Sequence, residues 1–303
     1  KGSQFANIGG INETATGDGH MLARELGAKL LNMDLTYGPE IRFIPPRQKN
    51  FMQILPTKGP LARTMGRLMP LVPQVVVSAV IKRLLVTWQH PEDAILDNGA
   101  ILVNSRGERF CDETRWPDRE IAIASQPGGI CYLLLDERLI ERYSAWPHYI
   151  STAPEIAYAY VEDYLRLRPE IAVSGDTLES VARRRNLPPL ALRQTVENFK
   201  HFANGEAPDP FDRGNSARPL DGKRWVLLGP AKAYFTTTAG GVAINQRLQV
   251  LDNSDEPIPG LHAVGLVGTG GQVLWGHGLN IAWALTSGRL VGKFIANGGP
   301  RKD

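Results

Sequence analysis

The chain has 303 residues, of which 43% are hydrophobic and 21% are charged, and its formal net charge is +3. This length is enough for two domains with a full hydrophobic core, and the composition is that of an ordinary globular protein. No run of Lys and Arg dominates the sequence, so a nucleic-acid partner has little electrostatic support.

The two cysteines, Cys111 and Cys131, are too few for a disulfide framework, and they form no CxxC pair that would suggest a metal site. We expect two reduced thiols in a cytoplasmic protein. The chain begins with Lys1 and a polar, glycine-containing run without a signal peptide, which indicates a truncated or cut start.

The first predicted helix lies within residues 16–31, which read TGDGHMLARELGAKLL. Three leucines recur there at four-residue spacing and predict the apolar stripe of an amphipathic helix. They are Leu22, Leu26 and Leu30. Asp18 and Gly19 stand at the start of this helix, where a carboxylate interacts favourably with the positive end of the helix dipole.

The most apolar stretch of the following proline-rich region is residues 71–88. Pro73 and Gln74 break it and Lys82 and Arg83 lie inside it, so it does not meet the requirement of about 20 uncharged apolar residues for a membrane span. A buried or amphipathic helix is predicted instead. The alternative is a lid or a subunit contact. A subunit contact would make the protein a homo-oligomer.

Two strand regions follow. A hairpin is predicted from residues 101–103, through the turn residues 104–107, to residues 109–111. Residues 129–136, which read GICYLLLD, predict a further strand with an apolar, buried character.

Residues 176–203 predict two short helices, the first capped by Asp176-Thr177 and the two separated by Pro188-Pro189. Such a pair resembles a DNA-binding helix-turn-helix, but Val181 and Leu187 suit a packing face and the basic run is short. A polar connector rich in Gly and Pro follows at residues 204–223 and is typical of a crossing between domains.

The C-terminal region changes character. It predicts a hairpin of residues 241–245 and 248–251, a strand at 261–264 and a final helix from about Asn280 to Ala296. The glycine-dense loop before that helix lets a ligand approach the backbone, and helix N-terminal amides favour negative charge. Its spacing differs from the G-x-G-x-x-G turn of dinucleotide-binding proteins.

Four segments carry a resemblance to a known family, and they begin ATGDG, NGAILVN, TAGGV and GLVGTGG. They are residues 15–34, 98–113, 238–261 and 265–292. In this order and spacing they resemble the fumarate reductase / succinate dehydrogenase flavoprotein family, which includes the 3-ketosteroid dehydrogenases. The resemblance covers nearly the whole chain.

The resemblance implies an α/β and α+β fold, with an incomplete FAD-binding domain and an inserted cap, and FAD as the cofactor. Residues 1–34 correspond to the last piece of the first FAD-domain segment, residues 35–225 to the cap or substrate domain, and residues 226–303 to the returning FAD-domain segment. The half that carries the G-x-G-x-x-G turn is missing, so we expect the chain alone to bind FAD poorly or not at all.

The family also implies cofactor contacts in two places. The first is the TGDG turn, formed by Thr16, Gly17, Asp18 and Gly19. The second is the strand end and the opening of the last helix, at Gly265, Asn280, Ile281 and Ala282. Backbone amides there would face the pyrimidine edge of the flavin and stabilise the negative charge of its reduced form.

The chain departs from the fumarate reductase branch at the positions that hold a dicarboxylate. The position of that branch's arginine acid is Pro117, flanked by Arg115 and Arg119, and its two substrate histidines fall on Gly38 and Thr237. Because these positive groups are lost, dicarboxylate reduction is not expected.

The remaining groups near the expected flavin face are neutral or aromatic and suit a bulkier substrate. The substrate candidates are Tyr37, Thr237, Thr238 and Trp275. The catalytic candidates are His277, Tyr234, Arg115 and Arg119. The alternatives are a loop histidine without a role, a tyrosine packed in the core, and arginines in surface ion pairs with Glu113 and Glu120.

We therefore expect FAD-dependent oxidation or reduction of a carbon–carbon bond in a largely neutral or bulky small molecule, with an unidentified electron donor or acceptor. One alternative is an activity like that of the 3-ketosteroid Δ1-dehydrogenases. Another is a cap-and-tail fragment that only binds or assembles. A DNA-binding module at residues 176–203, which would bind in a salt-dependent manner, is not expected. No metal, nucleic-acid partner or membrane span is predicted.

Overall fold

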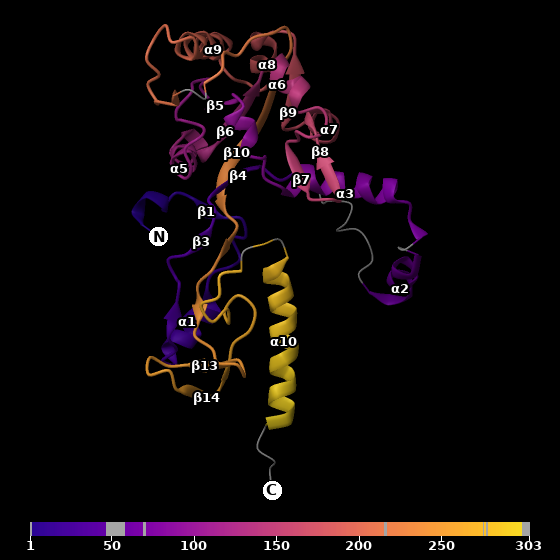
Figure 1. The fold of residues 1–303 in the computed structure, drawn as a ribbon, viewed down its shortest axis with the longest axis vertical. Helices are drawn as coiled ribbons and strands as arrows, with labels where there is room; N and C mark the ends of the chain where they lie inside the picture. Colours follow the sequence, from indigo (N-terminus) through magenta and orange to yellow (C-terminus); the bar gives the residue numbers. More distant parts are fainter. Residues whose placement is uncertain are drawn as a thin grey trace. The chain divides into compact units, whose positions relative to one another are not determined.

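The computed structural model describes residues 2–46, 58–68, 71–214, 217–274, 276 and 278–298. The chain divides into two compact units. Unit 1 combines Lys1–Pro39 with Tyr234–Asp303, and unit 2 is Glu40–Ala233. Figure 1 shows the elements of both units along the chain.

Unit 2 is built around the long strand β10 (Trp225–Phe235), most of which lies in this unit. It pairs antiparallel with β6 (Cys131–Leu135) on one side and with β9 (Ala172–Gly175) on the other. Strand β4 (Glu40–Phe43) also pairs with β10, and β5 (Ile101–Val103) pairs with β6. All residues of β5 and β6 are buried, although β5 is the last strand in the sheet order, because both strands are continuous apolar runs that are covered on both faces.

Helices and a small ribbon surround this sheet (Figure 1). The ribbon pairs β7 (Ser151–Ala153) with β8 (Ala157–Ala159). The helices of unit 2 are α2 (Gly59–Leu68), α3 (Gln74–Trp88), α4 (Ala94–Asp97), α5 (Asp118–Ala124), α6 (Glu137–Arg142), α7 (Val161–Leu167), α8 (Leu178–Arg184), α9 (Pro189–Ala203) and the 3-10 turn η4 (Pro127–Gly129).

Unit 1 consists of short elements and one long helix. Its paired strands are β1 (Gly9–Gly10) with the end of β10, β2 (Leu30–Leu31) with β12 (Gly241–Val242), β3 (Thr36–Tyr37) with β11 (Thr237–Thr238), and β13 (Gln249–Leu251) with β14 (Pro257–His262). Its helices are η1 (Ser3–Phe5), α1 (Asp18–Glu25) and α10 (Leu279–Gly298).

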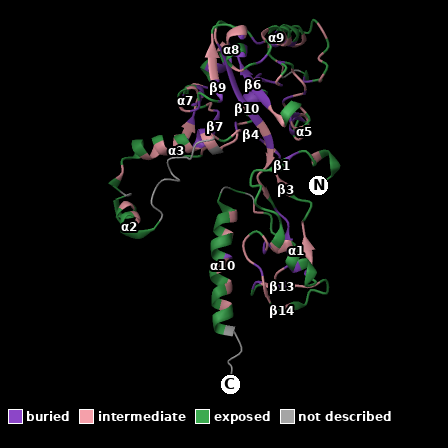
Figure 2. Cartoon of the chain, turned by 180° about the vertical axis from the view of Figure 1, so that it is seen from behind, coloured by how far each residue is buried: buried purple, intermediate pink, exposed green. Residues whose placement is uncertain are grey.

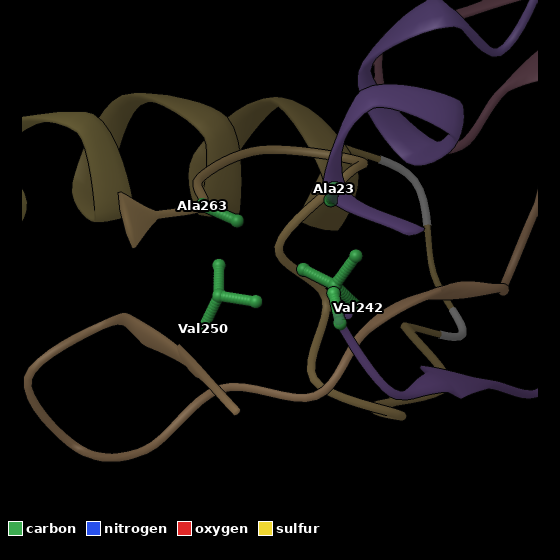
Figure 3. Packing of buried hydrophobic residues seen from close by; sticks show 5 residues of the cluster. Ala23, Val242, Val250 and Ala263 are labelled. Atoms are coloured by element: carbon green, nitrogen blue, oxygen red, sulfur yellow. The ribbon is translucent and has the colours of Figure 1, made fainter. Parts of the chain in front are cut away.

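The core of unit 1 is small. One cluster of five buried side chains lies in it, and Figure 3 shows this cluster from close by. They are Ala23, Ala28, Val242, Val250 and Ala263. By contrast, Figure 2 shows α10 coloured mainly as exposed, and large apolar side chains such as Ile281 and Leu285 face solvent.

Several predicted elements match the structure. The strand within residues 129–136 is β6, the final helix is α10, and Thr177 caps α8 by accepting a hydrogen bond from the Ser180 amide. Val181 of α8 and Leu187 of the connection to α9 are both buried. This burial favours a packed helix pair over a DNA-binding one. No helix within the described part of the chain combines the length and apolar character needed to cross a bilayer.

The first predicted helix is shorter than the leucine spacing indicated. Helix α1 ends at Glu25, because Gly27 adopts a left-handed conformation (φ 91°) and the Ala28 amide donates to the Ala23 carbonyl in a helix-ending turn. Leu22 and Leu26 are about 60% exposed. Of the predicted leucine stripe, only Leu30 packs against the core cluster of unit 1, and it does so from β2 and not from the helix.

Two predicted hairpins are also only partly right. Residues 109–111 form a single bridge, between Arg109 and Val103, because β5 takes β6 as its partner. Near the C-terminus, β13 pairs with β14, whereas Ile244 and Val250 share only an isolated bridge. In both cases a partner further along the chain replaces the adjacent one.

Candidate functional site

The TGDG turn opens α1. Gly17 occupies the N-cap with a left-handed backbone (φ 84°), and its carbonyl accepts hydrogen bonds from the amides of His20 and Met21. The Thr16 hydroxyl donates to Asp18 Oδ1 at 2.9 Å. A Cβ added at Gly17 would meet nothing within 4 Å, so this turn presents open backbone.

The turn lies directly against the glycine-rich loop of residues 265–271. A Cβ added at Gly19 would lie 2.8 Å from Val267 Cγ2, a separation at which something must shift. The TAGGV segment meets the same loop, since the Val242 amide donates to the Val267 carbonyl at 2.7 Å. The Thr269 hydroxyl in turn donates to the Ala239 carbonyl at 3.4 Å.

Helix α10 is tied to this loop near its opening. Trp283 Nε1 donates to the carbonyls of Gly265 and Gly268, at 3.0 and 3.1 Å. The Gly265 amide donates to the Ser287 hydroxyl at 3.0 Å. The loop therefore joins the TGDG turn, the TAGGV segment and the opening of α10 within unit 1.

The opening of α10 is accessible. Ile281 and Ala282 are exposed and Asn280 is half-buried. The Leu279 amide donates to the Gly276 carbonyl at 3.3 Å, and the Ala282 amide donates to the Gly278 carbonyl at 2.8 Å. An anionic group could thus approach the positive end of this helix dipole.

Three of the predicted substrate residues lie on one two-stranded ribbon. Thr237 of β11 is directly opposite Tyr37 of β3, and Thr238 is opposite Thr36. Directly opposed residues of an antiparallel pair project from the same face, so the side chains of Tyr37 and Thr237 are neighbours. Desolvation by burial raises the pKa of the Tyr37 phenol.

Tyr234 lies just before this ribbon, near the end of β10 and opposite Gly9. Burial raises the pKa of its phenol, and the negative charge of Glu13 raises it further. Tyr234 therefore keeps its proton at neutral pH and can donate it. The predicted residues Trp275 and His277 lie outside the described residues.

The two arginine candidates belong to unit 2 and differ in their exposure and in their bonding partners. Arg119 is 3% exposed and donates to Asp93 at 2.6 Å, to Glu120 at 2.7 Å and to the Glu113 carbonyl at 3.1 Å. These hydrogen bonds occupy the donors of its guanidinium group within the protein and favour a structural role. Arg115 is exposed, and its side chain forms no ion pair with a described residue.

His20 is a candidate site residue that sequence reasoning missed. Its Nε2 atom is buried and has no hydrogen-bond partner among the described residues. Buried polar atoms are nearly always bonded, so this nitrogen marks a place where another group is expected. Its position directly after the TGDG turn was the one available signal in the sequence.

A family model described as "FAD binding domain" matches residues 9–276. The chain belongs to this family. The probable fumarate reductase Ifc3 of Shewanella frigidimarina (strain NCIMB 400) is 27% identical over 288 residues, which cover 93% of this chain and 38% of that protein. The predicted membership of an FAD-binding flavoprotein family is confirmed.

Two solved structures share the fold. The open conformation of a flavocytochrome c3 fumarate reductase aligns with a TM-score of 0.62 and 24% identity, over 97% of this chain and 42% of that one. A 3-ketosteroid Δ1-dehydrogenase from Sterolibacterium denitrificans aligns with a TM-score of 0.50 and 19% identity, over 96% of this chain and 48% of that one. The predicted mixed α/β fold is confirmed. The chain spans less than half of the length of each of these proteins.

The described residues fit FAD in three respects. Open glycine backbone at Gly17 and Gly278 leaves room for a ligand, since a Cβ at either would meet nothing within 4 Å. The buried Nε2 of His20 lacks a partner beside the first of these glycines. The accessible opening of α10 offers a positive dipole end to an anionic group.

Proposed function

We propose that the chain forms the substrate-covering cap and the C-terminal part of the FAD domain of an oxidoreductase that acts on a carbon–carbon bond. One observation carries the proposal: the TGDG turn and the opening of α10 meet on the same glycine-rich loop, through Gly19, Val267 and Trp283. These are the segments in which the family resemblance places the flavin contacts, namely Thr16–Gly19, Gly265 and Asn280–Ala282.

In this proposal residues 1–34 and 226–303 belong to the FAD domain and residues 35–225 form the cap. The division of the chain into units at Pro39 and Tyr234 supports such an arrangement. The cap would hold the substrate, while the flavin site would be built within unit 1.

We further propose that another segment of the same protein completes the FAD domain. The buried apolar side chains described in unit 1 are few and mostly small, yet the unit exposes large apolar ones on two helices. Leu22 is 62% exposed on α1, and Ile281 and Leu285 are 69% and 72% exposed on α10. Apolar exposure on this scale marks a surface that another part of the protein covers. The chain alone would then bind FAD weakly.

When FAD is bound, it supplies the chemistry of hydride transfer to or from a substrate carbon. The chain's own residues would do the rest. The amides at Asn280 and Ile281 would stabilise negative charge at the pyrimidine edge, while the Ala282 amide, which donates to the Gly278 carbonyl, would hold the opening of the helix in place. A tyrosine with a raised pKa, Tyr234 or Tyr37, would hold the proton that is exchanged with the substrate. Arg115 and His277 remain candidates for the same task.

The proposed substrate is largely neutral or bulky. The ribbon that carries Tyr37, Thr237 and Thr238 contains no charged side chain, and Gly38 and Thr237 replace the histidines expected for a dicarboxylate. Neutral hydroxyl groups cannot compensate two carboxylates in a poorly solvated site. A 3-ketosteroid dehydrogenase-like activity is the specific alternative within this class.

The test compares the chain alone with the whole product of its gene. We expect the whole product to be yellow, and the chain to stay colourless or to take up added FAD only weakly. If both stay colourless with added FAD, the flavoenzyme proposal fails. If the chain alone is fully yellow, no further segment is required for binding.

The substrate class is tested on the yellow protein with an artificial electron acceptor or donor. Steroids and cyclic ketones should be turned over, whereas fumarate should not. Efficient fumarate reduction would contradict the neutral-substrate proposal. A yellow protein that turns over none of these compounds would favour the non-catalytic alternative.

A further inference from the structure

The sequence between Glu40 and Glu92 has an unusual charge pattern. The whole chain contains 31 Asp and Glu residues, but none of them lies in residues 41–91. The same stretch contains eight Lys and Arg residues and many apolar ones. It includes α2 and α3, so both helices combine positive charge with apolar side chains in the absence of acidic groups.

Helix α2 is amphipathic but has no buried residue. Leu61, Met65 and Leu68 recur at the i, i+4, i+7 spacing that places them on one face. Arg63 and Arg67 project from the other side of the helix. Leu61 is 62% exposed and Leu68 is 53% exposed, and Figure 2 shows α2 coloured mainly as exposed. The apolar face of α2 is therefore unpartnered among the described residues.

The exposed apolar surface continues into α3. Leu71 is 76% exposed and Val75 is 80% exposed. A cavity of about 850 Å³ lies along α3 and the end of α7, and valines and leucines form much of its lining, among them Val76, Val80 and Leu84. The surface is thus both apolar and hollowed.

The cations of this region are largely uncompensated. Lys82 pairs with Asp163 at 3.0 Å, but none of the exposed residues Lys58, Arg63, Arg67 and Arg83 forms an ion pair with a described residue. We define the α2–α3 face as the surface made of the apolar side chains Leu61, Leu68, Leu71 and Val75 together with Arg63 and Arg67, which form the polar side of α2.

We propose that the α2–α3 face docks on the surface of an anionic phospholipid bilayer. Lipid phosphates would compensate the arginines, and the outer part of the acyl region would receive the leucines and valine. A second copy of the chain is a poor partner, because a symmetric contact would bring the two acid-free faces together and their positive charges would repel. An acidic protein would compensate the arginines, but a strongly charged surface is a poor environment for the four exposed aliphatic side chains of this face.

Vesicle flotation of the full chain tests this proposal without depending on the flavin chemistry. The probes are vesicles of phosphatidylcholine alone and of phosphatidylcholine mixed with phosphatidylglycerol. We expect the chain to float with the mixed vesicles and not with the neutral ones, and rising salt should weaken binding. Circular dichroism should show the same folding for all variants, since α2 buries no side chain.

Two variants remove the two contributions separately. Arg63→Glu/Arg67→Glu reverses two charges and should lower the bound fraction roughly tenfold or more. Leu71→Ser/Val75→Ser should also lower it clearly, because apolar burial contributes in parallel. The matched controls are Arg142→Glu/Arg183→Glu, two exposed helical arginines elsewhere in unit 2, and Leu190→Ser, which is 74% exposed. Both should bind like the unmodified chain.

Three results would overturn the proposal. The chain could fail to float with anionic vesicles, or the control variants could lose binding as much as the α2–α3 variants. Light scattering could instead show that Leu71→Ser/Val75→Ser converts a dimer to a monomer without vesicle binding, which would identify a second copy as the partner. Retention on polyglutamate without vesicle binding would identify an acidic protein.

Discussion

Gly19 and Val267 are separated by 248 positions in sequence, yet a Cβ placed on Gly19 would lie 2.8 Å from Val267 Cγ2. This contact brings the TGDG turn onto the loop that precedes α10. It accounts for a glycine at this position in physical terms, because any side chain would displace either the turn or the loop.

The contact predicts a specific loss of FAD affinity. In the whole protein, Gly19→Ala should weaken FAD binding about tenfold. The added methyl group would displace either the TGDG turn or the loop that precedes α10, so the two groups of FAD contacts would no longer be correctly placed relative to each other. Adding Val267→Ala should restore part of the affinity by making room for the methyl group. Gly66→Ala, in α2 of unit 2, is the matched control, since a Cβ there meets nothing within 4 Å. FAD titration followed by flavin fluorescence measures all four proteins, and equal affinities would contradict the predicted contact.

A buried ion network in unit 2 should dominate the effect of charge substitutions on stability. Glu113 is fully buried and accepts hydrogen bonds from Arg109 at 2.9 and 3.0 Å, from Arg213 at 2.9 Å and from the Leu102 amide at 3.2 Å. Arg213→Met leaves this carboxylate with one cationic partner fewer and should lower the free energy of unfolding by about 3–5 kcal/mol.

The matched control for this network is an exposed ion pair. Arg193 bonds Glu179 at 3.0 Å on the surface, and Arg193→Met should cost about 0–1 kcal/mol. Urea unfolding monitored by circular dichroism distinguishes the two variants. If Arg213→Met unfolds at the same urea concentration as Arg193→Met, the network contributes no more than a surface pair.

The same network predicts how stability depends on pH. Partial burial opposes ionisation of Asp209, but hydrogen bonds from Arg109 and from the amides of Phe211 and Arg213 outweigh it and lower its pKa below 3.8. A carboxyl whose pKa is lower in the folded protein stabilises it above the unfolded pKa, and this stability is lost as pH falls through the folded pKa.

Asp209→Asn should therefore be less stable than the unmodified protein at neutral pH, and the difference should shrink below about pH 4. Asp97→Asn, an exposed carboxylate in the same unit, serves as the control. Thermal unfolding at a series of pH values measures the difference. A constant difference across the acid range would show that Asp209 does not titrate with a lowered pKa.

Much of the fold follows from local patterns in the sequence, but the pairing does not. Strand β6 and helix α10 are continuous apolar or helix-forming segments, and each can be recognised on its own. The strand partner of β13 cannot be recognised in this way, because β14 and the predicted strand at residues 241–245 both lie nearby in sequence and only packing selects between them. The spacing of Leu22 and Leu26 predicted a helix face that packs on a core, and this prediction was wrong for another reason: both side chains are exposed in this chain.

The candidate site also has parts that the sequence predicted and parts that it did not. Family motifs pointed to the TGDG turn and the opening of α10, while no periodicity indicated that Gly19 and Trp283 share one loop. His20 was missed because a lone histidine in a helix has no local signature, and only its buried, unpartnered nitrogen distinguishes it. Arg119 was named from its position near Pro117, and it forms the ion pair with Glu120 that the alternative named, but its guanidinium is buried and its second ion pair is with the distant Asp93.

The tyrosines predict a separation of chemistry from cofactor binding. If Tyr234 supplies the proton, Tyr234→Phe should lower kcat by about 10²–10⁴ and leave FAD affinity unchanged. Tyr37→Phe should produce this loss instead if Tyr37 supplies it. Tyr149→Phe, in unit 2, is the control. Because burial and Glu13 raise the pKa of Tyr234 above 10, the activity should show no loss of this proton at neutral pH.

The exposed face of α10 gives the last prediction, which tests the proposed covering of unit 1. Leu285 is 72% exposed in the chain. In the chain alone, Leu285→Ser should therefore change the free energy of unfolding by less than about 0.5 kcal/mol. In the whole product of the gene, a covered Leu285 would lose its burial, and the same substitution should cost about 2–4 kcal/mol. Leu190→Ser, on the exposed side of α9, should have a small effect in both proteins. Urea unfolding of the two proteins side by side decides the matter: an equal, small effect of Leu285→Ser in both would mean that no other segment covers α10.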